Sequence, residues 1–155
     1  MHHLLKASSL LLAVLATFLS GCTTGGSPHV SLSTISRVYV ADTVGASTSE
    51  TASASNAVHD ASVSELRRLG YVVVTNTSEA DAVLKSSWRI KKSEDNRNDL
   101  QVASLSVSLF DKKNRRLFDA DSGPSVPANF WNESRASTEI ASMLNRLGRA
   151  TTSQK

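Results

Sequence analysis

Cysteine is nearly absent from this chain of 155 residues, which contains only one, Cys22. A single cysteine cannot pair within the chain, so the fold cannot depend on disulfide bonds for its stability. Aromatic residues make up only 5% of the sequence, and alanine, valine and leucine dominate its apolar residues. We therefore expect a core of small, closely packed side chains without a large aromatic ligand pocket.

Strong net charge of either sign is also missing. The chain has 17 Lys and Arg against 14 Asp and Glu, a formal charge of +3. Removal of residues 1–21 would take away Lys6 and no acidic residue, which leaves 16 basic and 14 acidic residues and a charge of +2. So mild a charge gives no electrostatic argument for nucleic acid as a partner.

Long apolar runs are confined to the N-terminus. A short basic start, Met1–Lys6, leads into a nearly unbroken apolar run over 7–19. This run is shorter than the roughly 20 residues that a membrane-spanning helix needs, and the polar residues 23–28 after it contain no stop-transfer cluster of charges. We predict a signal peptide over 1–21. The alternatives are an ordinary secretory signal or a true membrane helix, either one followed by a cysteine that stands there by chance.

The apolar run closes with Leu19, Ser20, Gly21 and Cys22, and this tetrapeptide resembles the lipobox of bacterial lipoproteins. The resemblance implies a diacylglycerol thioether on Cys22 and an acylated amino group, which would bind the protein to a lipid bilayer. Two acyl chains already give stable anchoring, at about 0.8 kcal/mol per buried methylene. In that family an aspartate after the cysteine favours the inner membrane, and here Thr23 follows it. The resemblance therefore implies an outer-membrane location facing the periplasm.

The remainder divides into three parts. Residues 22–34 are rich in glycine and hydroxyl side chains and predict a flexible tether. Residues 35–148 are enough for one small domain and too few for two cores. Residues 149–155 are expected to form a disordered tail.

The first half of the domain predicts a strand, a helix and a second strand. Strands are expected over 36–41 and 71–75, where apolar and β-branched residues are frequent. Between them, Ser47 and Glu50 have the spacing of a capping box, and Gly70 suits the left-handed end of a helix. Such a unit crosses over in the right-handed sense and makes its two strands parallel.

The second half predicts an antiparallel sheet and a closing helix. Residues 82–91 and 101–109 alternate between apolar and polar side chains, and 115–120 would complete a hairpin. A final helix over 133–147 would be capped by Asn132. Together these elements predict an α/β (α+β) fold, a two-layer sandwich with one mixed, mostly antiparallel sheet and two helices on one face.

Two segments of this domain, 66–71 (LRRLGY) and 79–84 (EADAVL), separated by a valine run, resemble a group of small envelope lipoproteins. The group comprises the lipopolysaccharide-assembly lipoprotein, the periplasmic domain of the curli-secretion lipoprotein and the lipoproteins that activate penicillin-binding proteins. The chain lacks the long insertion of a curli-type pore domain. The resemblance implies a non-catalytic accessory or adaptor protein that docks on or stabilises a larger envelope-assembly or secretion complex. The alternatives are a structural envelope lipoprotein without a dedicated partner and a cell-wall-modifying hydrolase.

Residues suited to chemistry are few. No Gly-x-Ser-x-Gly motif occurs, and His59, the only histidine within the domain, is expected to be a half-exposed helix residue. The acidic pair Asp119 and Asp121 begins a calcium-loop pattern, but Pro124 and Phe130 stand where the loop needs glycine and glutamate. We predict no enzyme activity, no cofactor and no metal site. Trp131, just before the helix cap, is expected to pack on the helix and not to bind a ligand.

One face of the predicted sheet is a candidate binding surface. If 82–91 pairs antiparallel with 101–109, one outer face carries two cations and four hydroxyls: Lys85, Ser87, Arg89, Ser104, Ser106 and Ser108. Such a face could bind an acidic envelope protein, an acidic glycan or lipopolysaccharide phosphates. The alternative is that these serines simply solvate an exposed sheet.

Overall fold

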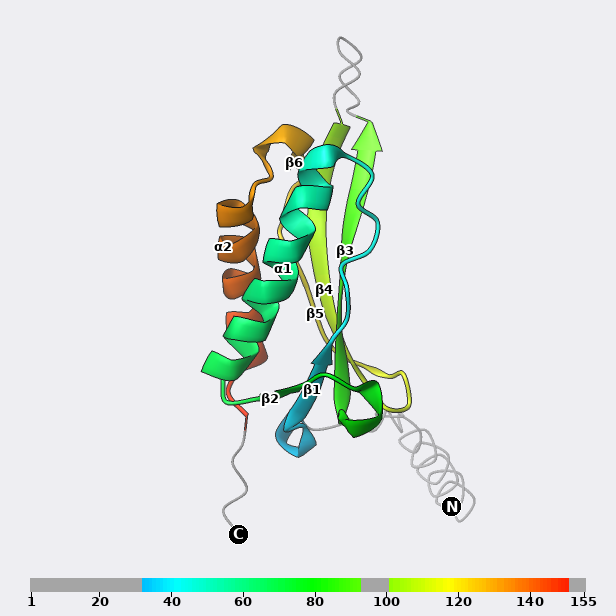
Figure 1. Cartoon of the computed structure of the whole chain (residues 1–155), viewed down its shortest axis with the longest axis vertical. Coiled ribbons are helices and arrows are strands. Elements are labelled where there is room, and N and C mark those ends of the chain that lie inside the picture. The colour runs from blue at the N-terminus through cyan, green and yellow to red at the C-terminus, as the bar shows by residue number, and fades with distance from the viewer. Residues whose placement is uncertain (1–31, 93–100, 151–155) are drawn as a thin grey trace, which may run out of the picture.

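The N-terminal half of the domain forms the expected strand, helix and strand (Figure 1). In the computed structural model, which describes residues 32–92 and 101–150, strand β1 (Arg37–Val40) leads to helix α1 (Ser49–Arg68) and strand β2 (Val72–Val74). β2 pairs in parallel with β1, as predicted. The signal peptide, the lipobox, Cys22 and most of the predicted tether lie outside the described residues, as do 93–100 and 151–155.

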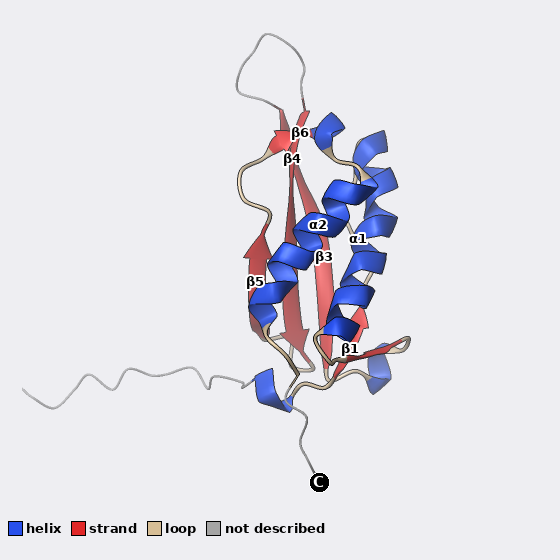
Figure 2. Cartoon of the chain, turned by 90° about the vertical axis from the view of Figure 1, so that its left-hand side faces the viewer, coloured by secondary structure: helices blue, strands red, loops and turns tan. Residues whose placement is uncertain are grey.

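The second half supplies four strands and a helix. β3 (Ala82–Lys92) pairs in parallel with β1, and then β4 (Gln101–Asp111) and β5 (Arg116–Asp121) follow in antiparallel order. The strand order is β2-β1-β3-β4-β5, and β6 (Val126–Pro127) also pairs with β4. Figure 2 shows α1 and α2 (Glu133–Leu144) together on one face of this mixed sheet. The predicted two-layer α+β sandwich is confirmed.

Four short 3-10 turns complete the described chain. They are η1 (Leu32–Thr34), η2 (Thr77–Glu79), η3 (Ala128–Phe130) and η4 (Asn145–Leu147). The described part of the domain extends past both predicted boundaries. The N–H of Ile35 donates to the carbonyl of Leu32 at 3.0 Å, and the N–H of Ala150 donates to the carbonyl of Leu69 at 2.9 Å.

Helix α1 begins at a different cap from the one predicted. Thr48 is the N-cap: its Oγ1 accepts the N–H of Thr51 at 3.2 Å, and Thr51 Oγ1 accepts the N–H of Thr48 at the same distance. The predicted pair of Ser47 and Glu50 is therefore wrong by one residue. Thr51 is completely buried, and this packing decides between two pairs with the same spacing.

Helix α1 ends at the predicted glycine, whereas α2 is shorter than the predicted 133–147. Gly70 has φ +91°, its N–H donates to the carbonyl of Arg67, and the N–H of Tyr71 donates to the carbonyl of Leu66. These two bonds form a Schellman motif that closes α1. Asn132 caps α2 as predicted, accepting the N–H of Arg135 at 2.9 Å. α2 itself stops at Leu144, and η4 carries the chain to Gly148 (φ +79°).

The core lies between the helices and the inner face of the sheet. Its largest fully buried side chains come from α1, β3, β4 and α2 and include Leu66, Leu84, Leu105, Ile140 and Leu144. The two tryptophans meet within it: the rings of Trp88 and Trp131 are 4.7 Å apart, edge to face. The Nε1–H of Trp131 donates to the carbonyl of Ala103 at 3.1 Å, so this buried side chain is part of the core. In the described ranges no helix is long and apolar enough to cross a bilayer.

Candidate binding surfaces

The register of β3 and β4 brings the six predicted surface residues together. Three cross-strand pairs form: Lys85 with Ser108, Ser87 with Ser106, and Arg89 with Ser104. The residues between them, among them Trp88 and Leu105, are buried on the helix side, so the six share the opposite side of the sheet. We call this surface the serine face.

Most polar groups of the serine face are bonded within the sheet. Arg89 Nη2 lies 3.2 Å from Asp121 Oδ1 on β5. Ser108 donates a hydrogen bond to Asp119, which is also on β5. The hydroxyls of Ser87 and Ser106 are 2.9 Å apart.

The remaining cation of the serine face, Lys85, also has a partner. Its Nζ stands 4.9 Å from the ring centre of Phe110. Ser104 and Ser106 are only 8% exposed. An acidic partner would therefore have to compete with contacts already made, and its binding to this face stays a prediction.

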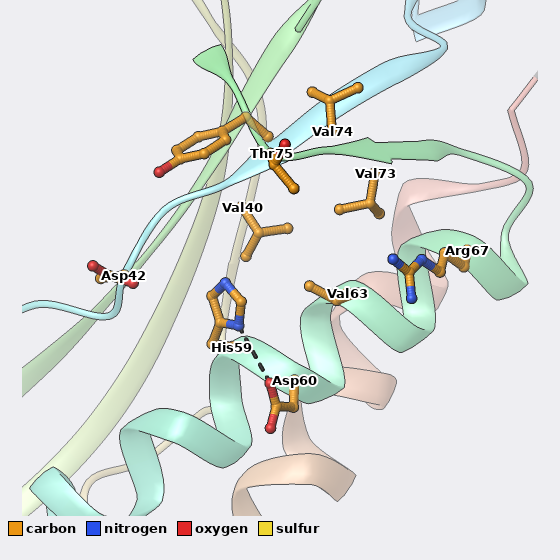
Figure 3. Close-up of a pocket in the computed structure, with 10 residues that line it drawn as sticks. Val40, Asp42, His59, Asp60, Val63, Arg67, Val73, Val74 and Thr75 are labelled. Carbon is orange, nitrogen blue, oxygen red and sulfur yellow. Dashed lines mark hydrogen bonds and ion pairs between the residues drawn. The ribbon is translucent and has the colours of Figure 1, made fainter.

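A groove opens between α1 and the strands β1 and β2, on the helix side of the sheet (Figure 3). Its volume is about 380 Å³. Apolar side chains Val40, Val63 and Val73 line it together with polar and charged ones: Asp42, His59, Asp60, Arg67 and Thr75. We call it the α1–β2 groove. The groove is not evident from the sequence. Asp42 suits a turn, His59 suits a half-exposed position on a helix, and Arg67 supplies a favourable charge at a helix end.

The groove exists because α1 leans away from the short strands. The helix packs most extensively on α2 and touches β1 and β2 at few residues. β2 has only three residues and forms one end of the sheet, so the helix leaves its Val73 partly exposed. A second cavity of about 350 Å³ shares Asp42, His59 and Asp60 with the groove and continues it along the helix.

The wall of the groove at Asp42 is held firmly against β3. The N–H of Val44 donates to the carbonyl of Ser86 at 3.1 Å, and the N–H of Trp88 donates to the carbonyl of Val44 at 2.9 Å. Gly45 has φ +82°, and a Cβ at this position would lie 2.7 Å from the carbonyl oxygen of Trp88. Only glycine permits this close approach.

Buried hydroxyls fix the same wall from inside. Thr43 Oγ1 lies 2.8 Å from the hydroxyl of buried Ser86. The indole N–H of Trp88 donates to Ser55 Oγ on α1 at 3.0 Å. Helix, strand and wall are therefore linked, and the groove is formed before any ligand arrives.

The charged groups of the groove are unevenly paired. His59 Nδ1 lies 3.4 Å from Asp60 Oδ1, and the histidine side chain is 37% exposed. Asp42 and Arg67 form no ion pair with any described residue. Within 32–92 and 101–150, no group of three or more His, Cys, Asp and Glu side chains is arranged to hold a metal ion. The arrangement favours non-covalent binding of a ligand that carries one positively and one negatively charged group.

Comparison with known proteins gives likeness in structure only. No protein-family model matches the sequence, and no curated protein matches it. The PelC dodecamer from Paraburkholderia phytofirmans is similar in structure, with a TM-score of 0.51 and 18% identity over 79% of this chain and 92% of that one. A PelC variant with one leucine-to-methionine change gives a TM-score of 0.50 and 19% identity, over 74% of this chain and 86% of that chain.

A third solved structure is less completely covered. A PDZ domain protein from Parabacteroides distasonis gives a TM-score of 0.50 and 10% identity, over 79% of this chain but only 33% of that one. At these identities the comparisons establish a shared fold. The architecture of this domain is thus one that also occurs in a protein that assembles into a dodecamer.

Proposed function

We propose that this protein is a lipid-anchored accessory protein of the outer membrane, facing the periplasm, that docks on or stabilises a larger envelope complex and acts without catalysis. The observation that carries the proposal is the likeness of its domain to PelC, which spans 92% of the PelC chain. PelC forms a dodecamer, so this architecture supports assembly through protein contacts.

The anchor of this proposal is Cys22, with Leu19, Ser20 and Gly21 as its lipobox. Nine residues, 23–31, separate Cys22 from Leu32, where the described domain begins, so the chain takes ten steps between them. At no more than about 3.6 Å per residue, covalent geometry limits their reach to about 36 Å. Such a tether would keep the domain close to the membrane surface, within reach of complexes embedded there.

Crosslinking tests the proposal directly. Full-length protein and a Cys22→Ala variant would be crosslinked in host membranes and purified, with mass spectrometry of the co-purified proteins and of the N-terminal peptide. We expect a triacylated Cys22 peptide and one envelope complex from the wild type, and loss of both from the variant. Lipidation without a specific partner would contradict the adaptor function, and an unmodified Cys22 would contradict the anchor. Turnover of cell-wall glycans by the purified protein would favour the hydrolase.

Self-assembly is a second candidate function, favoured by the dodecameric state of PelC. Native mass spectrometry of the full-length protein in detergent would test it. We expect a single closed oligomer whose mass is a multiple of the monomer. A monomer at all concentrations would exclude self-assembly and leave the adaptor function untouched.

A further inference from the structure

We infer that the α1–β2 groove binds an extended peptide segment of a partner protein, with a basic side chain at the Asp42 end and an acidic side chain at the Arg67 end. This inference rests on the proposed adaptor function and names the chemistry of its partner.

The two free charges lie at opposite ends of the groove. α1 connects two parallel strands, so it runs antiparallel to both. Arg67, in its last turn, therefore lies near the start of β2, whereas Asp42 follows the end of β1. Figure 3 shows these two side chains on opposite sides of the row of lining residues, with His59 and Val63 between them. A ligand with one charge of each sign would be held in one direction.

The middle of the groove suits small apolar side chains. Val40, Val63 and Val73 lie there, and the volume of about 380 Å³ is at the small end of the range of ligand sites in proteins. Asp60 contacts His59 between the two ends, and its side chain is 84% exposed, so solvent screens its negative charge. A phosphate-rich ligand would meet the carboxylates of Asp42 and Asp60, so the lining disfavours polyanions.

The exposed edge of β2 adds backbone groups that a peptide can bond. The N–H of Val72 donates to the carbonyl of Ser36 at 2.8 Å, towards β1. Because these groups alternate along a strand, the N–H and C=O of Val73 face the free edge. A peptide strand laid beside β2 can pair with them, as in β-strand addition.

A second copy of this chain fits the edge poorly. Its other free edge strand, β5, runs in the same direction as β2 and carries Arg116 at its start and Asp121 at its end. In a ring of copies in which β5 of one copy lies beside β2 of the next, the two strands would run in the same direction. Arg116 would then approach Arg67, and Asp121 would approach Asp42. Asp121 is already paired with Arg89, and Arg116 lies 3.5 Å from Asp119, so a second copy would offer neither end an unpaired charge of opposite sign. We therefore assign the groove to another protein.

A matrix of nine labelled peptides tests the assignment. Each has the centre Thr-Val-Thr-Val-Thr, with Lys, Gln or Glu at either end, and binding to the full-length protein in detergent micelles is followed by fluorescence anisotropy. Relative to the peptide with Gln at both ends, a peptide with one matched charge should bind about threefold more tightly. A peptide with a Lys end and a Glu end, both matched, should bind about tenfold more tightly. One of the two orders should bind more tightly than the other.

Charge exchange makes the test specific. Asp42 and Arg67 are both exposed, so Asp42→Lys combined with Arg67→Glu should keep the fold, which circular dichroism checks, and should reverse the preferred order. Arg146→Glu, at an exposed cation that lines a different cavity beside β5 and α2, is the matched control and should change nothing. Equal binding of both orders, or an unchanged preference in the exchanged variant, would overturn the assignment. A pull-down without a partner, alongside intact peptide preference, would contradict the adaptor function and not the groove.

Discussion

The serine face and the α1–β2 groove lie on opposite sides of one sheet and differ in how their charges are used. On the serine face, Arg89 is paired with Asp121 and Lys85 stands over Phe110. In the groove, Asp42 and Arg67 form no ion pair with any described residue. The cations of the serine face, which the alternation of the sequence predicted, thus already have partners. The groove, which the sequence did not predict, has two charged side chains without an ion-pair partner among the described residues. A partner gains more where it meets charges without an existing competitor.

The two regions also differ in packing, which gives the largest expected effect. Leu105, beneath the serine face, is completely buried, whereas Val63 in the groove is partly exposed. Leu105→Ala should lower the free energy of unfolding by about 3 kcal/mol, because it leaves a cavity in a closed core. Val63→Ala should cost less than about 1 kcal/mol, because the site already borders solvent. Urea denaturation of both variants measures the difference, and equal losses would mean that the groove is closed in solution.

The rigidity of the groove wall can be broken at one glycine. Gly45→Ala should destabilise the protein by about 3 kcal/mol, because the new Cβ would meet the Trp88 carbonyl at 2.7 Å in addition to the strain of φ +82°. Gly123→Ala is the matched control: its φ is +84°, and a Cβ there meets nothing within 4 Å. It should cost about 1 kcal/mol. Similar losses in thermal unfolding would show that the close approach at Gly45 is unimportant.

The pairing on the serine face should be weak but measurable. A double-mutant cycle of Arg89→Ala and Asp121→Ala should give a coupling of about 0.5 kcal/mol, which decreases at high salt because both side chains are about half exposed. Arg67→Ala should cost less than about 0.5 kcal/mol, because no described side chain loses an ion pair with it and only its favourable charge at the end of α1 is removed. A coupling energy of zero would mean that Arg89 is available to a partner, and it would support the serine face as a binding surface.

The smallest effect concerns pH and depends on a carboxylate that is hydrogen-bonded in the folded state. Burial alone would raise the pKa of Asp81, but the N–H groups of Arg37 and Ser36 donate to it, and its pKa is lowered below its ordinary value of 3.8. Its contribution to stability is therefore complete above that value and is lost as the pH falls through the lower pKa of the folded state. Asp81→Asn should reduce the loss of stability in acid, and an unchanged loss would contradict this account of Asp81. Urea titrations of the wild type and the variant at several acidic pH values measure the difference.

Local signals in the sequence were enough for most of the fold. Alternation in 82–91 and 101–109 gave the strands and their faces, and Gly70 and Asn132 gave helix ends, because each depends on near neighbours. The two-residue strand β6 was missed: it contains Pro127 and is held only by pairing with β4. The cap at Thr48 was missed because burial of Thr51, a long-range effect, selected it.

The partners of the charged residues could not be predicted in the same way. Arg89 meets Asp121 only because β5 pairs with β4 in one register, which a bulge at Leu109 and Phe110 shifts. That register depends on the turn in which Asp111 accepts the N–H groups of Lys113 and Arg115. The groove likewise depends on how far α1 leans from β2. Both are properties of tertiary geometry and not of spacing along the chain.

The turn between α1 and β2 holds both ends of the described chain: the carbonyl of Leu69 accepts the N–H of Ala150, and the N–H of Val72 donates to Ser36. Entry and exit of the chain are therefore neighbours at one pole of the domain (Figure 1). In the lipid-anchored protein that we propose, this pole would lie nearest the membrane, and a reporter attached behind Ala150 would be near the bilayer. The end of β3 and the start of β4 lie at the opposite pole (Figure 1), where a label would be far from the bilayer.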